Sequence, residues 1–245
     1  YFVFTPAGTV TEFPLPNPGS GPSRIVAGPD GNLWFTEADG NRIGRITTSG
    51  VITEFPLPTP AANPGGIAVG PDGALWFTEA ATHRIGRIST TGTFSPSIDV
   101  PDAGSLPFGI VGGSDGALWI TAYTGQRILR MTMAGEFTEF ALPDPITFPA
   151  SLAQAQDGAL WFTEFGGKRV GVLALPLAIA TASLPPGTRN ASYLQTLARS
   201  GGIAPYGSWV LADGSLPPGL SLDPASGRLS GVPTAVGTWT FTVAI

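Results

Sequence analysis

One tract of eight residues recurs four times along this chain, and this repetition limits the possible folds more than any other feature. Its first copy reads Asp30-Gly-Asn-Leu-Trp-Phe-Thr-Glu37, and the others begin at Asp72, Asp115 and Asp157. The tryptophans stand at positions 34, 76, 119 and 161, so the copies are 42, 43 and 42 residues apart. A period near 42 is typical of one four-stranded blade of a β-propeller. Helical repeats of similar length are excluded because 34 Gly and 25 Pro, the two poorest helix formers, stand among the 245 residues.

Each repeat divides into four short strands. In the first copy we expect them at Ile25–Ala27, Leu33–Thr36, Arg42–Ile46 and Val51–Leu57. The first two strands are joined by Asp30-Gly31, and Asp-Gly between apolar runs is a strong hairpin signal. We interpret the Asp of each Asp-Gly as a turn residue. The four tryptophans, one per repeat, are predicted to lie in the core between blades.

The two ends of the repeat region hold incomplete blades. Residues Tyr1–Phe4 and Thr9–Leu15 have the pattern of a third and a fourth strand, and residues 149–173 have that of the first three. Three whole blades and two partial ones are therefore predicted for residues 1–173. They form either an arc of a larger propeller or a closed four-bladed ring, within the known range of four to eight blades. We favour the arc, and we expect the chain to be a fragment of a longer protein.

A different pattern follows the last repeat. Residues 174–183 are interpreted as a linker or a first strand. Residues 184–245 hold short alternating strands between Gly and Pro turns, which is typical of a β-sandwich. The prediction is thus an all-β chain, a propeller followed by an immunoglobulin-like (Ig-like) β-sandwich that is incomplete at its C-terminal end.

Both segments resemble known families. The units Gly66-Ile-Ala-Val-Gly-Pro-Asp-Gly-Ala-Leu-Trp-Phe-Thr-Glu79, Arg84-Ile-Gly-Arg-Ile88 and Thr53-Glu-Phe-Pro-Leu-Pro58 resemble the repeat of the virginiamycin B lyase (streptogramin lyase) family. Leu216-Pro-Pro-Gly-Leu-Ser-Leu-Asp223 and Leu229-Ser-Gly-Val-Pro-Thr234 are similar to the Ig-like (cadherin-like) modules of bacterial surface proteins. The first resemblance implies a seven-bladed propeller and an enzyme that opens a cyclic depsipeptide by elimination. It also implies a His base and carboxylates that hold Mg²⁺, which would stabilise the developing enolate.

The residues that begin the innermost strands do not match that chemistry. The resemblance implies a Pro-His-Gly-like start, whereas the four starts contain no His: Pro22-Ser-Arg24, Pro64-Gly-Gly66, Pro107-Phe-Gly109 and Pro149-Ala-Ser151. The single His, His83, stands in a turn where the other repeats have Asn41, Gln126 and Lys168. We therefore name no catalytic residue and no cofactor. The alternative is a carbon–oxygen lyase with Mg²⁺.

Three carboxylates at one repeat position could form a metal site. Glu37, Glu79 and Glu164 end the second strands, and an Arg begins each following strand. One interpretation is a cross-strand ion pair within each blade. The other is a ring of carboxylates around the propeller axis that binds a cation. We favour the ion pairs, because the third repeat replaces Glu with Ala122 and keeps Arg127.

A ligand site is expected where loops converge at the mouth of the axial channel. The residues that begin the innermost strands differ between repeats, and this variation is where a regular scaffold could encode specificity. We predict ligand contacts from Arg24 and Phe108. The ligand is a small molecule, a peptide or a glycan.

The net charge and the hydropathy pattern argue against a nucleic-acid partner and against a membrane-spanning segment. The net charge of −5 excludes nucleic acid, because phosphate binding needs clustered Lys and Arg. The longest apolar run, residues 172–180, is interrupted by Pro176 and is too short for a membrane span. The Ig-like resemblance implies export, so we expect an extracellular or surface-attached binding or scaffold protein, with a protein or cell-surface partner. A purely structural adhesion module is a further alternative.

Overall fold

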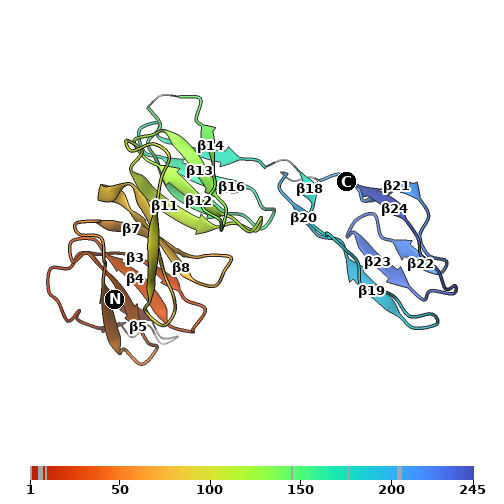
Figure 1. The fold of residues 1–245 in the computed structure, drawn as a ribbon, viewed down its shortest axis with the longest axis horizontal. Coiled ribbons are helices and arrows are strands. Elements are labelled where there is room, and N and C mark those ends of the chain that lie inside the picture. Colours follow the sequence, from red (N-terminus) through yellow and green to blue (C-terminus); the bar gives the residue numbers. More distant parts are fainter. Residues whose placement is uncertain (1, 5–7, 9, 145, 176, 203–205) are drawn as a thin grey trace. The chain divides into compact units, whose positions relative to one another are not determined.

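The computed structural model describes residues 2–4, 8, 10–144, 146–175, 177–202 and 206–245. Apart from one 3-10 turn, η1 (Ala80–Thr82), the regular elements in these ranges are β-strands, and the strand pairs are antiparallel (Figure 1). Nowhere in these ranges is there a helix that is long and apolar enough to cross a membrane. The chain divides into two units, Tyr1–Gln154 with Leu160–Val172 and Ala155–Ala159 with Leu173–Ile245.

The first unit contains the predicted blades. Three four-stranded sheets follow one another in sequence order, and a three-stranded sheet comes after them (Figure 1). Blade 1 contains β3 (Pro22–Ala27), β4 (Leu33–Glu37), β5 (Arg42–Ile46) and β6 (Ile52–Pro56); blade 2 contains β7 (Pro64–Val69), β8 (Leu75–Glu79), β9 (Arg84–Ile88) and β10 (Phe94–Asp99); blade 3 contains β11 (Pro107–Gly112), β12 (Leu118–Ala122), β13 (Arg127–Met131) and β14 (Phe137–Ala141); blade 4 contains β15 (Pro149–Gln154), β16 (Leu160–Glu164) and β17 (Arg169–Leu173). The predicted propeller architecture is confirmed.

Every innermost strand begins with a β-bulge. In blade 1 the register shifts between Pro22 and Ile25, and the other three blades show the same shift. The two residues inside each bulge are here called the bulge pair. The four bulge pairs are Ser23-Arg24, Gly65-Gly66, Phe108-Gly109 and Ala150-Ser151. These residues are the ones that vary between repeats in the sequence. The variation is therefore located in the bulges, where the backbone departs from regular strand pairing.

A threonine of the second strand joins each blade to the next. In blade 2 the Thr78 hydroxyl accepts a hydrogen bond from the Gly66 N–H (2.8 Å) and donates one to the Phe108 carbonyl of blade 3 (3.0 Å). Thr36 and Thr121 repeat this pattern toward the carbonyls of Gly65 and Ala150, both at 2.8 Å. We call this pair of hydrogen bonds the threonine link. Thr163 of blade 4 accepts from the Ser151 N–H at 3.1 Å.

The apolar core lies between neighbouring blades. Each blade has a forward face, which carries the Trp and the linking Thr and faces the next blade, and a backward face, which faces the previous one. Trp34 of blade 1 belongs to one buried cluster with Leu75 and Phe77 of blade 2, and Trp76 to another with Leu118 of blade 3. Residues on the two faces alternate along each strand, as the period of two requires.

The predicted burial of the tryptophans is confirmed for three of them and wrong for the fourth. Trp34, Trp76 and Trp119 are at most 4% exposed, whereas Trp161 is 44% exposed. The first three are each covered by the next blade, but no further blade follows β17 in the described residues.

The predicted role of the aspartates in the turns is confirmed, and in blades 1 to 3 each of them also accepts a hydrogen bond from the tryptophan of its own blade. Asp30, for example, accepts from the Asn32 N–H and also from the Trp34 indole N–H (3.0 Å), and blades 2 and 3 repeat both bonds.

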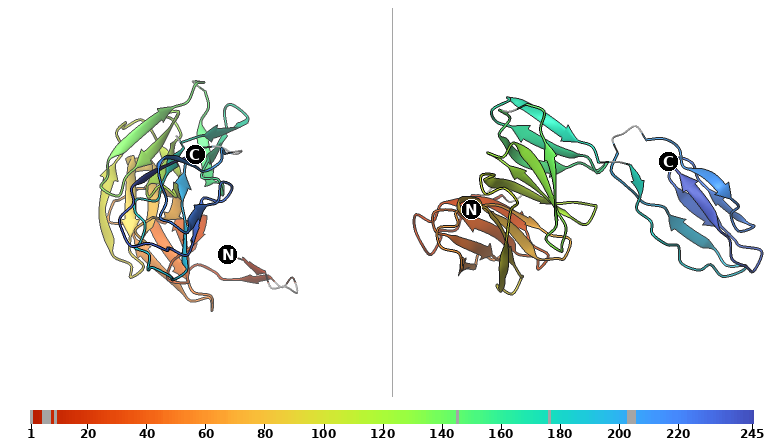
Figure 2. Two further views of the ribbon diagram at one scale, coloured as in Figure 1. Left: turned by 90° about the vertical axis from the view of Figure 1, so that its right-hand side faces the viewer. Right: turned by 45° about the horizontal axis from the view of Figure 1, so that its top comes forward.

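The two partial blades do not pair with each other. β1 (Phe2–Phe4) pairs with β2 (Val10–Glu12), as the sequence predicted for a third and a fourth strand. This hairpin is a sheet of its own, set apart from β15–β17 (Figure 2). Among the described residues the blades therefore form an arc, and the closed four-bladed ring is not formed.

In the part of the second unit that the structure describes, the strands form three small sheets. They are β18 (Ala178–Ile179) with β20 (Arg199–Ser200), β19 (Tyr193–Thr196) with β23 (Arg228–Gly231) and β22 (Leu220–Leu222), and β21 (Val210–Gly214) with β24 (Phe241–Ala244). Within residues 173–245, the buried apolar side chains that the structure describes include Leu197, Trp209 and Leu229. Residues 178–179, within the segment left open as linker or first strand, pair with β20.

Candidate functional site

The bulge pairs share one end of the propeller with the loops that follow the second strands. The pairing of Pro22 with Glu37 and of Pro64 with Glu79 places the start of each first strand beside the end of the second. Blades 3 and 4 have the same register. This end, here called the bulge end, therefore presents two variable segments from every blade.

The structure brings the two predicted ligand-contact residues together. The Arg24 guanidinium of blade 1 lies over the Phe108 ring of blade 3, 5.7 Å from its centroid. A row of aromatic rings continues from there, with Tyr123 5.8 Å from Phe108 and Phe148 5.3 Å from Tyr123. A cationic side chain over an aromatic ring is attractive through the ring quadrupole. Arg24 and Phe108 are thus parts of one surface, although they stand two repeats apart.

An apolar pocket adjoins this row. It has a volume of about 290 Å³ and is lined by Leu106, Phe108, Tyr123, Ala150 and Phe165. All five come from blades 3 and 4 or from the loops at their bulge ends. On blade 2 the bulge pair is Gly65-Gly66, and a Cβ on Gly66 would lie 2.5 Å from the Phe108 carbonyl oxygen. The bulge end therefore has an aromatic wall over blades 3 and 4 and small residues over blade 2.

Sequence reasoning missed four residues of this wall. Tyr123 and Phe165 follow the second strands, where the first two repeats have Ala38 and Ala80. Leu106 and Phe148 precede the bulge prolines, where the first two repeats have Gly21 and Asn63. The same signal that pointed to Arg24 and Phe108, variation at a fixed repeat position, would have found them.

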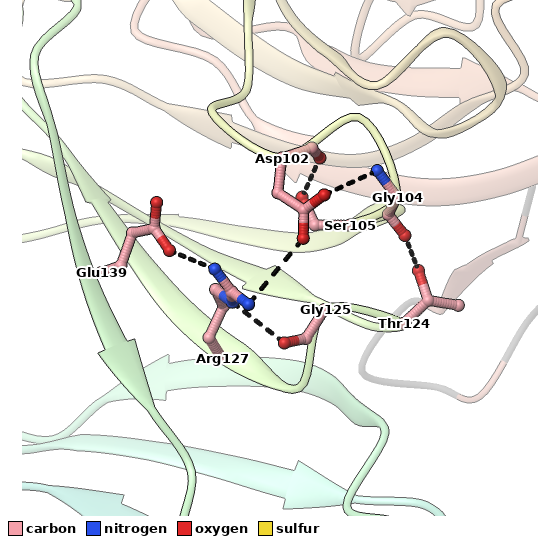
Figure 3. Close-up of polar contacts among 7 residues, drawn as sticks. All are labelled: Asp102, Gly104, Ser105, Thr124, Gly125, Arg127 and Glu139. Atoms are coloured by element: carbon pink, nitrogen blue, oxygen red, sulfur yellow. Dashed lines mark hydrogen bonds and ion pairs between the residues drawn. The ribbon is translucent and has the colours of Figure 1, made fainter. Parts of the chain in front are cut away.

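Hydrogen bonds and ion pairs hold the loop of residues 102–105, which leads to Leu106 of the pocket. The Asp102 carboxylate accepts from the Gly104 N–H (2.9 Å), and the buried Ser105 hydroxyl donates to the Asp102 carbonyl (2.6 Å). Arg127 reaches Asp102 and Glu139, and its Nε donates to the Gly125 carbonyl at 3.0 Å (Figure 3). Leu106 and Tyr123 directly adjoin Ser105 and Thr124 in the sequence, so the contacts of Arg127 and the hydrogen bond from Thr124 to the Gly104 carbonyl join the two loops that carry these pocket residues. Ala122 stands where other blades have Glu, which leaves Arg127 to these partners.

The three candidate metal-binding glutamates lie in different surroundings. Glu164 pairs with Arg169 at 2.9 Å, as the cross-strand interpretation predicted. That interpretation is wrong for Glu79, which accepts from Thr82 (3.0 Å) and Ser97 (2.7 Å), while its strand neighbour Arg84 pairs with Asp99. It is also wrong for Glu37, because Arg42 pairs with Glu54 at 3.7 Å.

Glu37 is fully buried, and neither of its carboxylate oxygens has a hydrogen-bond partner among the described residues. Burial raises the pKa of this carboxyl above its ordinary value of 4.5, and the nearby Glu54 raises it further. The positive charge of Arg42 lowers the pKa, which only partly offsets these effects. The Ser20 hydroxyl is nearby, but it donates its hydrogen bond to the Asn17 carbonyl and not to Glu37. The ionised form of Glu37 is therefore disfavoured in the folded protein.

We expect Glu37→Gln to raise the melting temperature at neutral pH. A raised folded-state pKa means that Glu37 stabilises the fold below pH 4.5 and loses that contribution as the pH rises through the folded pKa. The gain from Gln should thus vanish when the pH falls below 4.5. Glu79→Gln is the matched control and should give no gain, because Thr82 and Ser97 donate to the carboxylate it removes. Melting curves from pH 4 to 8 check this; an equal gain at every pH would contradict it.

The three glutamates are not brought together into one site. No group of three or more His, Asp or Glu side chains is close enough to hold a metal ion within the part of the chain that the structure describes. Glu79 and Glu164 already have donors or a cation beside them, so these glutamates do not fit a shared Mg²⁺ site. His83 lies in the loop after η1 with a left-handed backbone (φ 57°), where its carbonyl accepts from the Val100 N–H.

Comparisons with known proteins agree with this architecture. The model of the Virginiamycin B lyase family matches residues 3–96 and 67–192, and an Ig domain model matches residues 174–245. A streptogramin B lyase structure is 40% identical with a TM-score of 0.67, covering 70% of this chain and 57% of the other. The Staphylococcus aureus virginiamycin B lyase is also 40% identical, with a TM-score of 0.66, covering 71% of this chain and 62% of the other.

Two further matches are also lyases of this family. A catalytically inactive variant of the Staphylococcus aureus lyase with quinupristin is 32% identical with a TM-score of 0.67, and the match covers 94% of this chain and 73% of the other. The virginiamycin B lyase of Bacillus licheniformis is 50% identical over 38 residues, which are 16% of this chain and 13% of the relative. The chain thus spans less than two thirds of the first two lyase structures and a small part of the Bacillus protein.

Proposed function

Because this chain belongs to the virginiamycin B lyase family, we propose that its propeller binds a small molecule or peptide that carries an aromatic or bulky apolar group. One observation carries the proposal: Arg24 and Phe108 meet at the bulge end, beside an apolar pocket of about 290 Å³. Ligand pockets range from about 300 to 1,000 Å³. The pocket therefore suits one side group of a larger ligand rather than the whole of it.

The wall favours a particular ligand chemistry. Phe108 and Tyr123 offer ring faces and edges for stacking, which contributes about 0.5–1.5 kcal/mol per aromatic pair beyond burial. Arg24 is exposed and adds a cation that can donate to carbonyl or carboxylate oxygens. A peptide with aromatic side groups and a carbonyl-rich ring has both features. A family relative was solved with quinupristin, which supplies a suitable first probe.

We expect Phe108→Ala to weaken quinupristin binding about tenfold, because one stacking partner and one wall of the pocket are lost. The matched control is Val51→Ala, which removes an exposed apolar side chain (61%) from the opposite end of blade 1. Isothermal titration calorimetry of the whole chain measures both. Wild-type affinity in the Phe108 variant would sink the proposed site, and absence of wild-type binding would sink quinupristin as a ligand.

A lyase is the second candidate, supported by the 40% identity to two lyase structures. In such an elimination a base takes the α-proton, the ester C–O bond breaks, and a C=C bond forms. The described glutamates do not fit a shared Mg²⁺ site, so no step is assigned to them. The test is incubation with a type B streptogramin and Mg²⁺, followed by chromatography, since ring opening without water leaves the mass unchanged. Linearisation that EDTA abolishes would replace the binding proposal with this one.

The Ig-like unit supports a location outside the cell. Its family model and its resemblance to modules of surface proteins are compatible with export, and we propose an extracellular or surface-attached protein with a protein or cell-surface partner. The unit then acts as a spacer, or as the adhesive part of a purely structural module. Fractionation of the native host with an antibody to this chain tests the proposal; a signal confined to the cytoplasm would contradict it.

A further inference from the structure

Arg24 is a cation of the bulge end that no carboxylate balances among the described residues. Six of the other arginines in residues 1–173 have a carboxylate oxygen within 3.8 Å of a guanidinium nitrogen: Arg42, Arg84, Arg87, Arg127, Arg130 and Arg169. The seventh, Arg45, donates to the Thr90 carbonyl at 3.2 Å. The Arg24 guanidinium instead donates at 3.4 Å to the carbonyl of its own neighbour, Ser23. Its charge is therefore available to a ligand.

The side chain of Arg24 extends toward blades 2 and 3. Arg24 is the second residue of its bulge pair, like Gly66 and Gly109. A Cβ on Gly66 would lie 2.5 Å from the Phe108 carbonyl oxygen of the next blade, and one on Gly109 would meet the Ala150 carbonyl in the same way. The second residue of a bulge pair thus faces the following blade. The Arg24 guanidinium accordingly lies over the Phe108 ring of blade 3, and not over the exposed backward face of blade 1.

Phe108 holds this guanidinium by a contact that a ligand can replace. Arg24 is exposed, and a cation–π contact at an exposed site is weak. The bulge pair of blade 2, Gly65-Gly66, carries no side chains that could cover the guanidinium. Asp39, a carboxylate of the same blade, lies against Gly21 instead. A carboxylate that binds the guanidinium gains charge-assisted hydrogen bonds, which are about twice as strong as those between neutral groups.

The Phe108 ring borders both this cation and the apolar pocket. Phe108 and Tyr123 line the pocket, whereas Arg24 does not. A ligand group in the pocket therefore contacts Phe108 while the guanidinium lies 5.7 Å from the centroid of the same ring. A ligand that uses both needs an apolar or aromatic group and an anion a few bonds apart.

Building on the proposed function, we propose that the ligand is an aromatic carboxylate and that Arg24 is the residue that selects it. The aromatic ring occupies the pocket against Phe108 and Tyr123, and the carboxylate accepts two hydrogen bonds from the Arg24 guanidinium. N-acylated aromatic amino acids have this chemistry, and so do peptides that end in an aromatic residue. The net charge of −5 repels anions in general, so a preference for the acid has to come from a local cation.

Isothermal titration calorimetry of the whole chain with matched acids and amides tests this assignment. The probes are N-acetylphenylalanine and its amide, and a tetraglycyl-phenylalanine peptide with a free or an amidated C-terminus. In the wild type at least one acid should bind about tenfold more tightly than its amide, because the amide offers Arg24 no charge. In Arg24→Gln the acid and the amide should bind alike. Arg24→Lys should keep part of the difference, because it keeps the charge without the planar fork.

The two pairs of probes distinguish the source of the carboxylate. A larger preference within the amino-acid pair indicates a free aromatic acid, and a larger one within the peptide pair indicates a peptide C-terminus. Either result supports the role of Arg24, provided that Arg24→Gln abolishes it.

Lys168→Gln is the matched control. Lys168 is an exposed cation of the bulge end, in the loop between β16 and β17, and it does not line the pocket. Its replacement changes the net charge as much as Arg24→Gln does, yet it should leave the preference for the acid at about tenfold. Far-UV circular dichroism checks that each variant is folded.

Two results would overturn this inference. One is equal affinity of acid and amide for the wild type in both pairs, and the other is a preference for the acid that Arg24→Gln leaves intact. If acids and amides bind equally and Phe108→Ala weakens both, the binding site stands and only the role of Arg24 is wrong. If the wild type binds neither these probes nor quinupristin, the proposed function fails, and this inference fails with it.

Discussion

Replacing Trp119 with alanine is expected to lower the free energy of unfolding of the propeller by about 3–5 kcal/mol. The side chain is fully buried, packs against Phe140 at 5.4 Å, lies beneath Arg130 and donates its indole N–H to Asp115. A loss of this size is a large share of the total stability of a typical domain. Urea unfolding followed by far-UV circular dichroism measures it without relying on tryptophan fluorescence.

Trp161→Ala is the matched control, at the same position of the repeat. Because Trp161 is 44% exposed, its replacement should cost about 1 kcal/mol or less. If Trp119→Ala does not fold, Trp119→Phe keeps an aromatic ring in place, removes the hydrogen bond to Asp115 and leaves a smaller cavity than alanine does, for an expected loss of about 1–3 kcal/mol. Equal losses from Trp119→Ala and Trp161→Ala would show that burial between blades is not what makes these tryptophans stabilising.

The threonine link is expected to be the second large contribution. Thr78→Val keeps the shape of a fully buried side chain but leaves the Gly66 N–H and the Phe108 carbonyl without their partner. An unsatisfied buried polar group costs about 1–3 kcal/mol, so we expect a loss of about 2–4 kcal/mol from the two. The same urea titration measures this loss. The variant should also weaken quinupristin binding, because the link holds the backbone of Phe108.

Thr163→Val provides the comparison within the same chain. Thr163 is exposed, and water can replace the hydrogen bond that it accepts from Ser151. This variant should change the free energy of unfolding by less than about 0.5 kcal/mol. A loss as large as that of Thr78→Val would mean that the bond within the blade, rather than the bond between blades, supplies the stability.

The candidate site was partly predictable from the sequence. Variation at a fixed repeat position pointed to Arg24 and Phe108, which lie in contact with each other, and their contact with a ligand stays a prediction. Tyr123 and Phe165 of the loops show the same variation between repeats but were not among the predicted residues. The partners of the glutamates could not have been predicted from the repeat, because Ser97 and Asp144, which decide the surroundings of Glu79 and Arg169, lie outside its regular part.

The sequence by itself determined the elements within each blade: the strands, their turns and their antiparallel order. These depend on short hairpins and on alternation with a period of two, both of which are local. The tertiary structure decided which residues of different blades meet. It placed Arg24 on Phe108, buried three tryptophans, exposed Trp161 and left Glu37 without a hydrogen-bond partner among the described residues. Such contacts join residues at least one repeat apart, and they depend on how one blade packs against the next. The repeat therefore predicts the fold of a single blade, whereas the packing of neighbouring blades determines which contacts equivalent residues make in each copy of the repeat.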